Sequence, residues 1–485
     1  MKQYPRLALL ALLICLLPTF VTAQEKESVQ HIFDEWSKTS VLDQASIGFY
    51  AIDAKTGELL GASTPQLSMA PASILKLITT STALELLGAD YQFETKLAYI
   101  GKLSGDTLNG DLVIVAGGDP ALGSKYFKDY KPYQNFVGHW AEVIEKLGIK
   151  HITGNLIIDS SVYDDQSIPA TWIWEDMGNY YGAGVFGLSA YDNTYVIHFS
   201  SPATAGEQTR IEYTLPVLPN VDFDNRVLSS DENRDQAYVF GSPLDTKRVI
   251  RGTIPKDRTD FAVKASIPDP PLLVGTQLMQ ELALKQIDMS GEVRCDIVEK
   301  PEGLVTVSTI KSPRLSQIID VTNHESVNLF AEHFLKHMAY VTTGLGTTET
   351  GIDLVTEFWK QKGMDTKGLF MEDGSGLSRF NTISAKQMVF MLNYMKNESV
   401  NSEAFFNSLP TVPNGTLWYF NQNNFPRQAL RAKSGSMTRV RSFAGQLKTQ
   451  SKRTVLFAIL LNNFSCSQSQ AIKTIEQLLV DIEHQ

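Results

Sequence analysis

A serine and a lysine three residues apart, Ser73 and Lys76, open an apolar segment near the start of the chain. The pattern over 73–87 predicts a helix, and residues three apart share one helical face, so the two side chains can touch. A desolvated lysine can lose its proton and then accept the proton of a serine hydroxyl. Such a pair could make the serine a nucleophile for acyl transfer.

The Ser-x-x-Lys spacing alone is a weak signal, because about two matches are expected by chance in a chain of this length. Ser308–Lys311 has the same spacing, but this stretch is predicted to be a strand, in which the two side chains would not share a helical face. Taken by itself, Ser73 is most simply interpreted as a helix N-cap.

Two further motifs follow in the chain. Ser326-Val327-Asn328 begins an apolar helical segment at 324–340, and Lys433-Ser434-Gly435-Ser436 lies just before a predicted strand at 442–448, at one end of the strand layer. Each has a second copy, at 399–401 in an expected loop and at 55–57 in an expected hairpin turn. Only the order Ser-x-x-Lys, Ser-x-Asn, Lys-Ser/Thr-Gly gives the set its specificity, since this is the order in the active-site serine penicillin-recognising enzymes.

Four other stretches strengthen this comparison: Gly117–Leu122 (GGDPAL), Gly154–Asp159 (GNLIID), the segment Trp172–Asn193, and Asp373–Arg379 (DGSGLSR). With them the chain resembles the class C low-molecular-mass penicillin-binding proteins, the D-alanyl-D-alanine carboxypeptidase/endopeptidase family. The long interval between the first two motifs also fits this family, whose extra domains are inserted there.

The resemblance implies a serine peptidase that trims peptidoglycan stem peptides and cross-links through an acyl-enzyme. Ser73 would attack the carbonyl between two D-alanines, and Lys76 would accept its proton. Ser326 would relay a proton to the leaving D-alanine. Water would then hydrolyse the acyl-enzyme, and β-lactam antibiotics would acylate Ser73 as inhibitors.

The resemblance also implies the groups that bind the substrate. Asn328 would hold a substrate amide, Lys433 and the Ser434 hydroxyl would bind the terminal carboxylate, and the backbone N–H groups of Ser73 and Ser436 would form the oxyanion hole. Two positions depart from the family. Val327 replaces a common Asp, and Ser434 replaces the usual Thr but keeps its hydroxyl.

Asp159, Tyr163 and Arg379 match positions that help form the pocket for the diamino acid of the stem peptide in relatives. A strand cap at Asp159 and a surface ion pair at Arg379 are equally good interpretations. Trp172 and Trp174 are expected to lie in the core rather than to stack on a ligand.

The expected fold is α/β: a penicillin-binding-protein/serine β-lactamase-like domain, with a five-stranded antiparallel sheet flanked by helices, interrupted by a β-rich insertion. The catalytic domain would comprise 24–90 and 271–485, and 91–270 would form one or two inserted β-rich domains. Serine and lysine suffice for the chemistry, so we expect neither a metal nor an organic cofactor.

Residues 1–23 are typical of a secretory signal peptide, with a basic start, an apolar run and a small-residue cleavage site. After cleavage we expect a protein without a membrane span, secreted across the inner membrane into the periplasm. The net charge of −10 argues against nucleic acid as a partner. Cys295 and Cys466 could pair outside the cytoplasm, but the sequence leaves this open.

Two alternatives stay open. A β-lactamase would share the acylation step but deacylate rapidly, and a non-catalytic peptidoglycan-binding protein could have kept the fold. The sequence also leaves open the balance of carboxypeptidase and endopeptidase activity, the identity of the diamino acid and the oligomeric state.

Overall fold

One five-stranded sheet contains strands from both the N-terminal and the C-terminal part of the chain. The computed structural model describes residues 28–130, 133–296 and 303–485, so the expected signal peptide lies outside the described residues. The strand order is β16-β17-β18-β1-β2, and every neighbouring pair is antiparallel. The strands are β1 Ser46–Asp53, β2 Leu59–Ser63, β16 Leu430–Met437, β17 Val440–Lys448 and β18 Thr454–Asn462. The expected five-stranded antiparallel sheet is therefore present.

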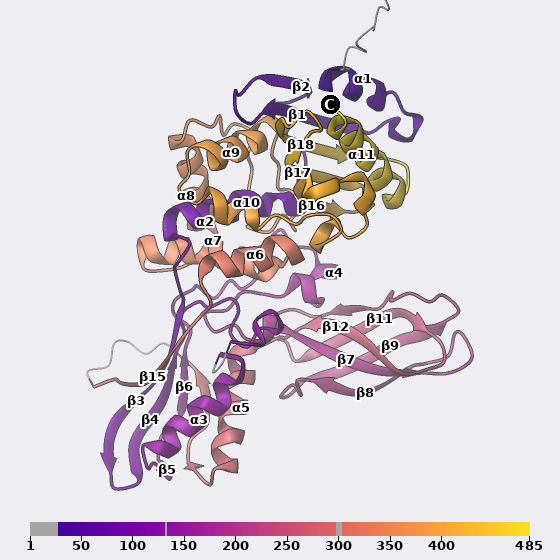
Figure 1. Cartoon of the computed structure of the whole chain (residues 1–485). Helices are drawn as coiled ribbons and strands as arrows, with labels where there is room; N and C mark the ends of the chain where they lie inside the picture. Colours follow the sequence, from indigo (N-terminus) through magenta and orange to yellow (C-terminus); the bar gives the residue numbers. More distant parts are fainter. Residues whose placement is uncertain (1–27, 131–132, 297–302) are drawn as a thin grey trace, which may run out of the picture.

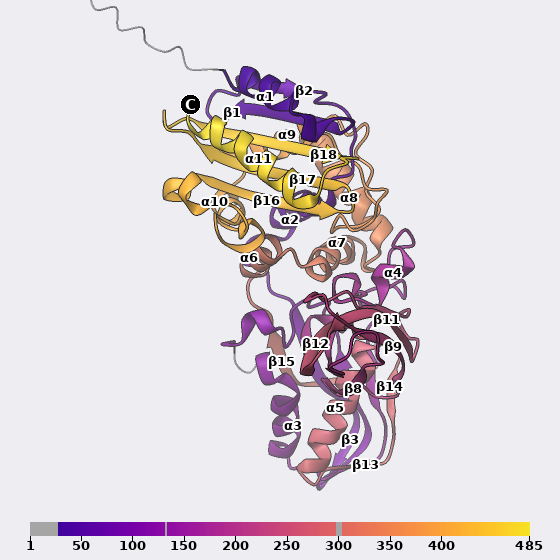
Figure 2. The same cartoon turned by 90° about the vertical axis from the view of Figure 1, so that its right-hand side faces the viewer.

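Helices cover both faces of this sheet (Figures 1 and 2). On one face lie α1 Val29–Ser37 and α11 Gln468–Glu483, whose apolar sides pack on the sheet. The central strand β18 is buried almost throughout, as its continuous apolar run predicts. On the other face lie α2 Lys76–Leu87, α6 Leu315–Glu325, α7 Asn328–Thr343, α8 Thr348–Gln361, α9 Ala385–Asn397 and α10 Ser402–Asn407.

The region between α2 and α6 forms two β-rich parts below the helices (Figure 1). The first pairs β3 Glu94–Ser104, β4 Thr107–Val115, β5 His151–Ile152, β6 Leu156–Asp159, β13 Asp288–Met289, β14 Val293–Cys295 and β15 Val305–Lys311, beside α3 Phe136–Lys146 and α5 Pro270–Leu284. The second has its own apolar core, and its strands are β7 Thr194–Ser201, β8 Arg210–Leu215, β9 Asp222–Ser230, β10 Tyr238–Phe240, β11 Lys247–Pro255 and β12 Arg258–Ser266. The short helix α4 Trp174–Met177 lies between these parts and the helical layer.

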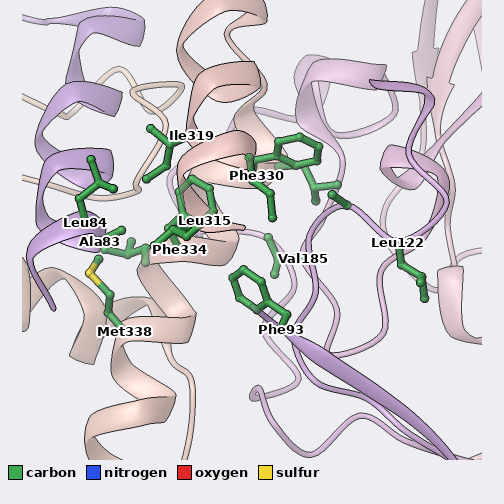
Figure 3. Packing of buried hydrophobic residues seen from close by; sticks show 14 of the residues in the cluster. Ala83, Leu84, Phe93, Leu122, Val185, Leu315, Ile319, Phe330, Phe334 and Met338 are labelled. Carbon is green, nitrogen blue, oxygen red and sulfur yellow. The ribbon is translucent and has the colours of Figure 1, made fainter. Parts of the chain in front are cut away.

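The core of the helical layer continues into the first of these parts. Figure 3 shows Phe93 and Val185 beside Phe330 and Phe334 of α7, and all four are buried in one apolar cluster. The strand β15 pairs with β3, so the chain stays with the inserted strands up to Lys311. The domain division remains a prediction, and this pairing favours a second boundary after Lys311 rather than at 271.

Three local details differ from the sequence-based expectations. Ser73 lies in a 3-10 turn, Ala72–Leu75, and the α-helix starts at Lys76. The segment 324–340 is broken at Ser326, which has φ 59°. Lys433–Ser436 lie inside the edge strand β16 instead of preceding the strand layer, because a polar, glycine-containing strand gives no alternating pattern.

Among the described residues, Cys295 and Cys466 are both free thiols. Within the same residues, every helix is too short or too polar to cross a membrane.

Candidate active site

Ser73 lies in a tight turn whose backbone is closely approached by two glycines, Gly376 and Gly435. The preceding Ala72 has φ 49°, a left-handed conformation that costs free energy in a residue with a Cβ. A Cβ on Gly376 would lie 2.1 Å from the Ala72 carbonyl oxygen, and a Cβ on Gly435 would lie 2.5 Å from the Pro71 oxygen and 3.0 Å from the Ser73 nitrogen. Only glycine permits these approaches, so the turn is held between β16 and the loop that contains Gly376.

Lys76 points directly at Ser73. In a 3-10 turn, side chains three residues apart are eclipsed, and the Lys76 Nζ lies 3.1 Å from the Ser73 Oγ. The same Nζ donates to the Asn328 Oδ1 at 2.5 Å and to the Ser375 carbonyl oxygen at 2.7 Å. The first two sequence motifs are thus brought together, and three contacts fix the position of the Lys76 nitrogen.

Burial changes the acidity of Lys76. Its side chain is fully buried, and this desolvation lowers the pKa of Lys76 to about 7, although the nearby Asp373 and Glu332 act in the opposite direction. Near neutral pH a large fraction of Lys76 is therefore unprotonated. An amine in that state, within hydrogen-bond reach of a hydroxyl, can act as its general base.

The DGSGLSR loop is organised by the Asp373 carboxylate. It accepts hydrogen bonds from Gly376 N (2.7 Å), Ser378 N (2.5 Å), Asn381 Nδ2 (2.8 Å) and Trp172 Nε1 (2.8 Å). Four donors on one buried carboxylate hold the loop rigidly against the Ser73 turn. Trp172 is buried, as expected, yet it also ties the inserted region to this loop.

Glu332 of α7 supports the same loop and was missed by the sequence reasoning. Its carboxylate accepts from Gly374 N at 2.9 Å and Ser375 N at 2.7 Å, which positions the Ser375 carbonyl for Lys76. Burial raises the pKa of Glu332, and the nearby Asp373 adds to this effect. The available signal was a lone acidic residue inside the apolar run of α7.

The second motif lies at a helix junction. Ser326 ends α6 in the left-handed region, its side chain is half-buried, and Asn328 is the first residue of α7. The Asn328 Nδ2 donates to the Tyr181 carbonyl oxygen at 2.7 Å, so this amide connects Lys76 to the inserted region. Ser326 stands two residues before Asn328 in the chain.

The third motif occupies the free edge of the sheet. Lys433 is fully buried, and its Nζ donates to the Ser434 carbonyl oxygen at 2.7 Å. Burial, together with repulsion from Lys76 and Arg441, holds the pKa of Lys433 well below its usual value. The Ala432 N–H points off the sheet edge, to the Pro410 oxygen, so the N–H groups of Ser434 and Ser436 point the same way.

The residues expected at the diamino-acid pocket lie farther from the pair. Asp159 ends β6 and accepts a hydrogen bond from Ser161 N at 3.0 Å, while the Tyr163 hydroxyl donates to the Gly118 oxygen at 3.0 Å. Both contacts are inside the inserted region.

Arg379 is exposed. Burial raises the pKa of Asp176, and the Tyr181 hydroxyl and the charge of Arg379 oppose this shift. The charge of Arg379 is therefore felt at Asp176, in the segment that also contains Tyr181.

Similar proteins share both sequence and fold with this chain. Residues 29–485 match the family described as D-Ala-D-Ala carboxypeptidase 3 (S13). A D-alanyl-D-alanine carboxypeptidase of Actinomadura sp. (strain R39) is 26% identical over 417 residues, 83% of this chain and 75% of that protein. The D-alanyl-D-alanine carboxypeptidase DacB of Haemophilus influenzae is 23% identical over 479 residues, 96% of this chain and 94% of that protein.

The crystal structure of penicillin binding protein 4 (dacB) from Haemophilus influenzae has the same fold. It superposes with a TM-score of 0.79 at 21% identity, covering 93% of this chain and 98% of that chain. A second crystal structure of that protein, complexed with a β-lactam, gives a TM-score of 0.76 at 20% identity over the same shares. The expected fold class is confirmed.

Proposed function

Because the chain belongs to the D-Ala-D-Ala carboxypeptidase 3 (S13) family, we propose that the site around Ser73 removes the terminal D-alanine from peptidoglycan stem peptides. The predicted family resemblance is confirmed, and the chain is a serine D-Ala-D-Ala carboxypeptidase. One observation carries the assignment of the site: the buried Lys76 Nζ lies 3.1 Å from the Ser73 Oγ, and the pKa of Lys76 is lowered to about 7.

In the proposed acylation, the Ser73 Oγ attacks the carbonyl carbon between the two D-alanines while Lys76 accepts its proton. The N–H groups of Ser73 and Ser436 stabilise the negative oxygen of the tetrahedral intermediate. The C–N bond then breaks, and the leaving amine receives a proton through Ser326. The direction of the Ser436 N–H off the free edge supports this arrangement.

In this proposal the Ser-x-Asn and Lys-Ser-Gly motifs bind the substrate. Asn328, held by Lys76 and Tyr181, presents its amide to a substrate amide. Lys433 and the Ser434 hydroxyl bind the terminal carboxylate, whose negative charge would favour the protonated form of the buried Lys433 amine.

A water molecule then hydrolyses the ester and restores the Ser73 hydroxyl. The same two steps would cleave a D-alanyl cross-link, because only the size of the leaving amine differs. We therefore include endopeptidase activity in the proposal.

Acylation by β-lactams is also part of the proposal. The Haemophilus influenzae protein of the same fold is known in complex with a β-lactam. Attack by Ser73 on the strained ring carbonyl opens the C–N bond, but the amine stays tethered to the acyl group, so the adduct would be long-lived.

Asp159 and Arg379 are proposed to recognise the diamino acid of the stem peptide. Arg379 is supported by the effect of its charge on Asp176, a residue of α4 in the segment that contains Tyr181. Asp159 rests on the motif match alone. Secretion into the periplasm is proposed from the signal-like residues 1–23.

The decisive experiment incubates the mature protein with fluorescent penicillin beside a Ser73→Ala variant and follows the adduct for hours, with release of D-alanine from a pentapeptide measured in parallel. We expect a stable adduct and D-alanine release, both lost in Ser73→Ala. Fast turnover of the drug without D-alanine release would identify a β-lactamase instead. A folded wild-type protein with neither activity would refute the proposal.

A further inference from the structure

Two buried basic side chains lie on neighbouring strands of the site. Lys433 on β16 is fully buried and Arg441 on β17 is 5% exposed, and Arg441 is paired with Ser436 in the strand register. Their mutual repulsion contributes to the lowered pKa of Lys433, after burial and the charge of Lys76. In the part of the chain that the structure describes, no Asp or Glu oxygen comes within 4.0 Å of either cation.

The contacts of Arg441 leave its charge without an anion. One guanidinium nitrogen, Nη2, donates to the Tyr419 hydroxyl, and the guanidinium carbon lies 4.7 Å from the Tyr419 ring centre and 5.1 Å from that of Phe443. The Nε is buried and lacks a hydrogen-bond partner among the described residues. Burial lowers the pKa of Arg441, but a guanidinium remains protonated in proteins.

Tyr419 does not neutralise this charge. Burial raises the pKa of Tyr419 even though the Arg441 charge acts against the rise, so the phenol is neutral at physiological pH. Ser434 lies near the Tyr419 hydroxyl and also acts against the rise in its pKa, while the Ser434 hydroxyl donates to the Thr416 oxygen at 3.2 Å. Tyr419 therefore lies between Arg441, which it contacts directly, and Ser434.

A buried charge without a partner is strongly unfavourable, so the site is stabilised when an anion enters it. Carboxylates are the anions that guanidinium and ammonium groups bind most specifically in proteins, through charge-assisted hydrogen bonds. The acidic side chains of the site, Asp373 and Glu332, act on Lys76 instead. Ser434, which belongs to the Lys-Ser-Gly motif, is the last residue in the series Arg441, Tyr419, Ser434.

We propose that Arg441, acting through Tyr419 and Ser434, is a positioning residue that makes the site select substrates with a free carboxylate beside the leaving nitrogen. This inference rests on the proposed function, because it assumes that Lys433 and Ser434 contact that carboxylate. Arg441 adds a second positive charge behind them and holds the Tyr419 hydroxyl towards Ser434. A neutral carboxamide in the same position gains nothing from this charge.

The test compares two peptides that end in D-Ala-D-Ala, one with a free carboxylate and one with a terminal carboxamide. In the wild-type enzyme we expect a higher kcat/KM for the carboxylate. Arg441→Met is expected to lower kcat/KM for the carboxylate by about 10- to 100-fold, the range of a charge-assisted hydrogen bond, and to leave the carboxamide within about 3-fold. Arg441→Lys restores part of the selectivity, and Tyr419→Phe reduces it to a smaller extent.

Arg439→Met is the matched control, because Arg439 is exposed in the turn before β17 and carries the same charge. Its selectivity should equal that of the wild type. An equal loss on both peptides in Arg441→Met would mean a purely structural role and would overturn the inference, as would an unchanged ratio.

Binding separates this inference from the proposed function. The Kd of each peptide is measured with Ser73→Ala and with Ser73→Ala/Arg441→Met, where no turnover is needed. Carboxylate selectivity that disappears with Arg441 supports the inference even if the wild type proves unable to release D-alanine. Weak binding of both peptides to Ser73→Ala, or selectivity that survives the second substitution, overturns it.

Discussion

The Trp172 indole nitrogen donates a 2.8 Å hydrogen bond to the Asp373 carboxylate across 201 positions of sequence. Through this contact, the inserted region shares in holding the loop that supports Lys76. The relationship makes the loop sensitive to a change in a residue outside the three motifs.

Trp172→Phe removes this hydrogen bond but keeps most of the buried ring. One acceptor site of a buried carboxylate is left empty, so we expect the free energy of unfolding to fall by about 1–3 kcal/mol. We also expect slower acylation by penicillin, measured by stopped-flow labelling. Trp140→Phe is the control, since the buried Trp140 indole nitrogen has no partner among the described residues. Equal effects of the two substitutions would contradict the prediction.

We expect the acylation rate to depend on the protonation of Lys76. Only the neutral amine accepts a proton, and the pKa of Lys76 is lowered to about 7. The second-order rate constant with penicillin should therefore fall about tenfold per pH unit below this pKa and level off above it. Rates are measured from pH 5 to 9, with the fold checked by circular dichroism at each pH. A profile that is flat between pH 5 and 7 would exclude Lys76 as the base.

Two buried histidines of α7 make the fold sensitive to acid. Burial lowers the pKa of His333 and of His337 to about 3, far below the unfolded value near 6.5. Their neutral forms therefore contribute stability that is present above about pH 6.5 and is lost as the pH falls towards 3. The loss is about 1.4 kcal/mol per histidine for each pH unit in this window.

Urea unfolding at pH 7 and pH 5 measures this dependence. His337→Gln should remove about half of the histidine contribution to the pH slope. An unaltered slope in His337→Gln would refute the assignment.

Gly435 allows the close approach between β16 and Ser73, the proposed nucleophile. The new methyl group in Gly435→Ala would meet the Pro71 oxygen at 2.5 Å and the Ser73 nitrogen at 3.0 Å, both backbone atoms that cannot yield cheaply. We expect penicillin labelling to fall by about 100-fold or more, the scale of a lost oxyanion contact. In Gly48→Ala the methyl group meets the Met69 sulfur at 3.0 Å, the end of a flexible side chain, so labelling should persist. Full labelling of a folded Gly435→Ala would contradict this geometry.

The sequence predicts the centre of the site better than its surroundings. Ser73, Lys76 and Asn328 belong to motifs whose order along the chain is informative, and the structure joins them by hydrogen bonds. Glu332 and Arg441 belong to no motif. Their importance depends on which loop or strand packs against them, and helical or strand periodicity carries no information on contacts between distant segments.

The fold likewise contains elements that the sequence predicts and elements that it does not. The apolar run of β18 and the amphipathic pattern of α1 predict a strand and a helix there, because such patterns follow from burial alone. The edge strand β16 was missed, since its residues serve the site rather than the core. The pairing of β15 with β3 could not be foreseen either, because register between distant strands is a tertiary property.

The contacts Trp172–Asp373 and Asn328–Tyr181 have a consequence for attempts to build a smaller enzyme. A protein shortened to the sheet and its helices would keep all three motifs, yet the Asp373 loop and the Asn328 amide would each lose a partner that holds them in place. Such a truncation would yield a scaffold with the proposed catalytic residues present but loosely positioned. The region between α2 and α6 thus supports the proposed active site as well as the architecture, and a minimal variant would need designed replacements for both contacts.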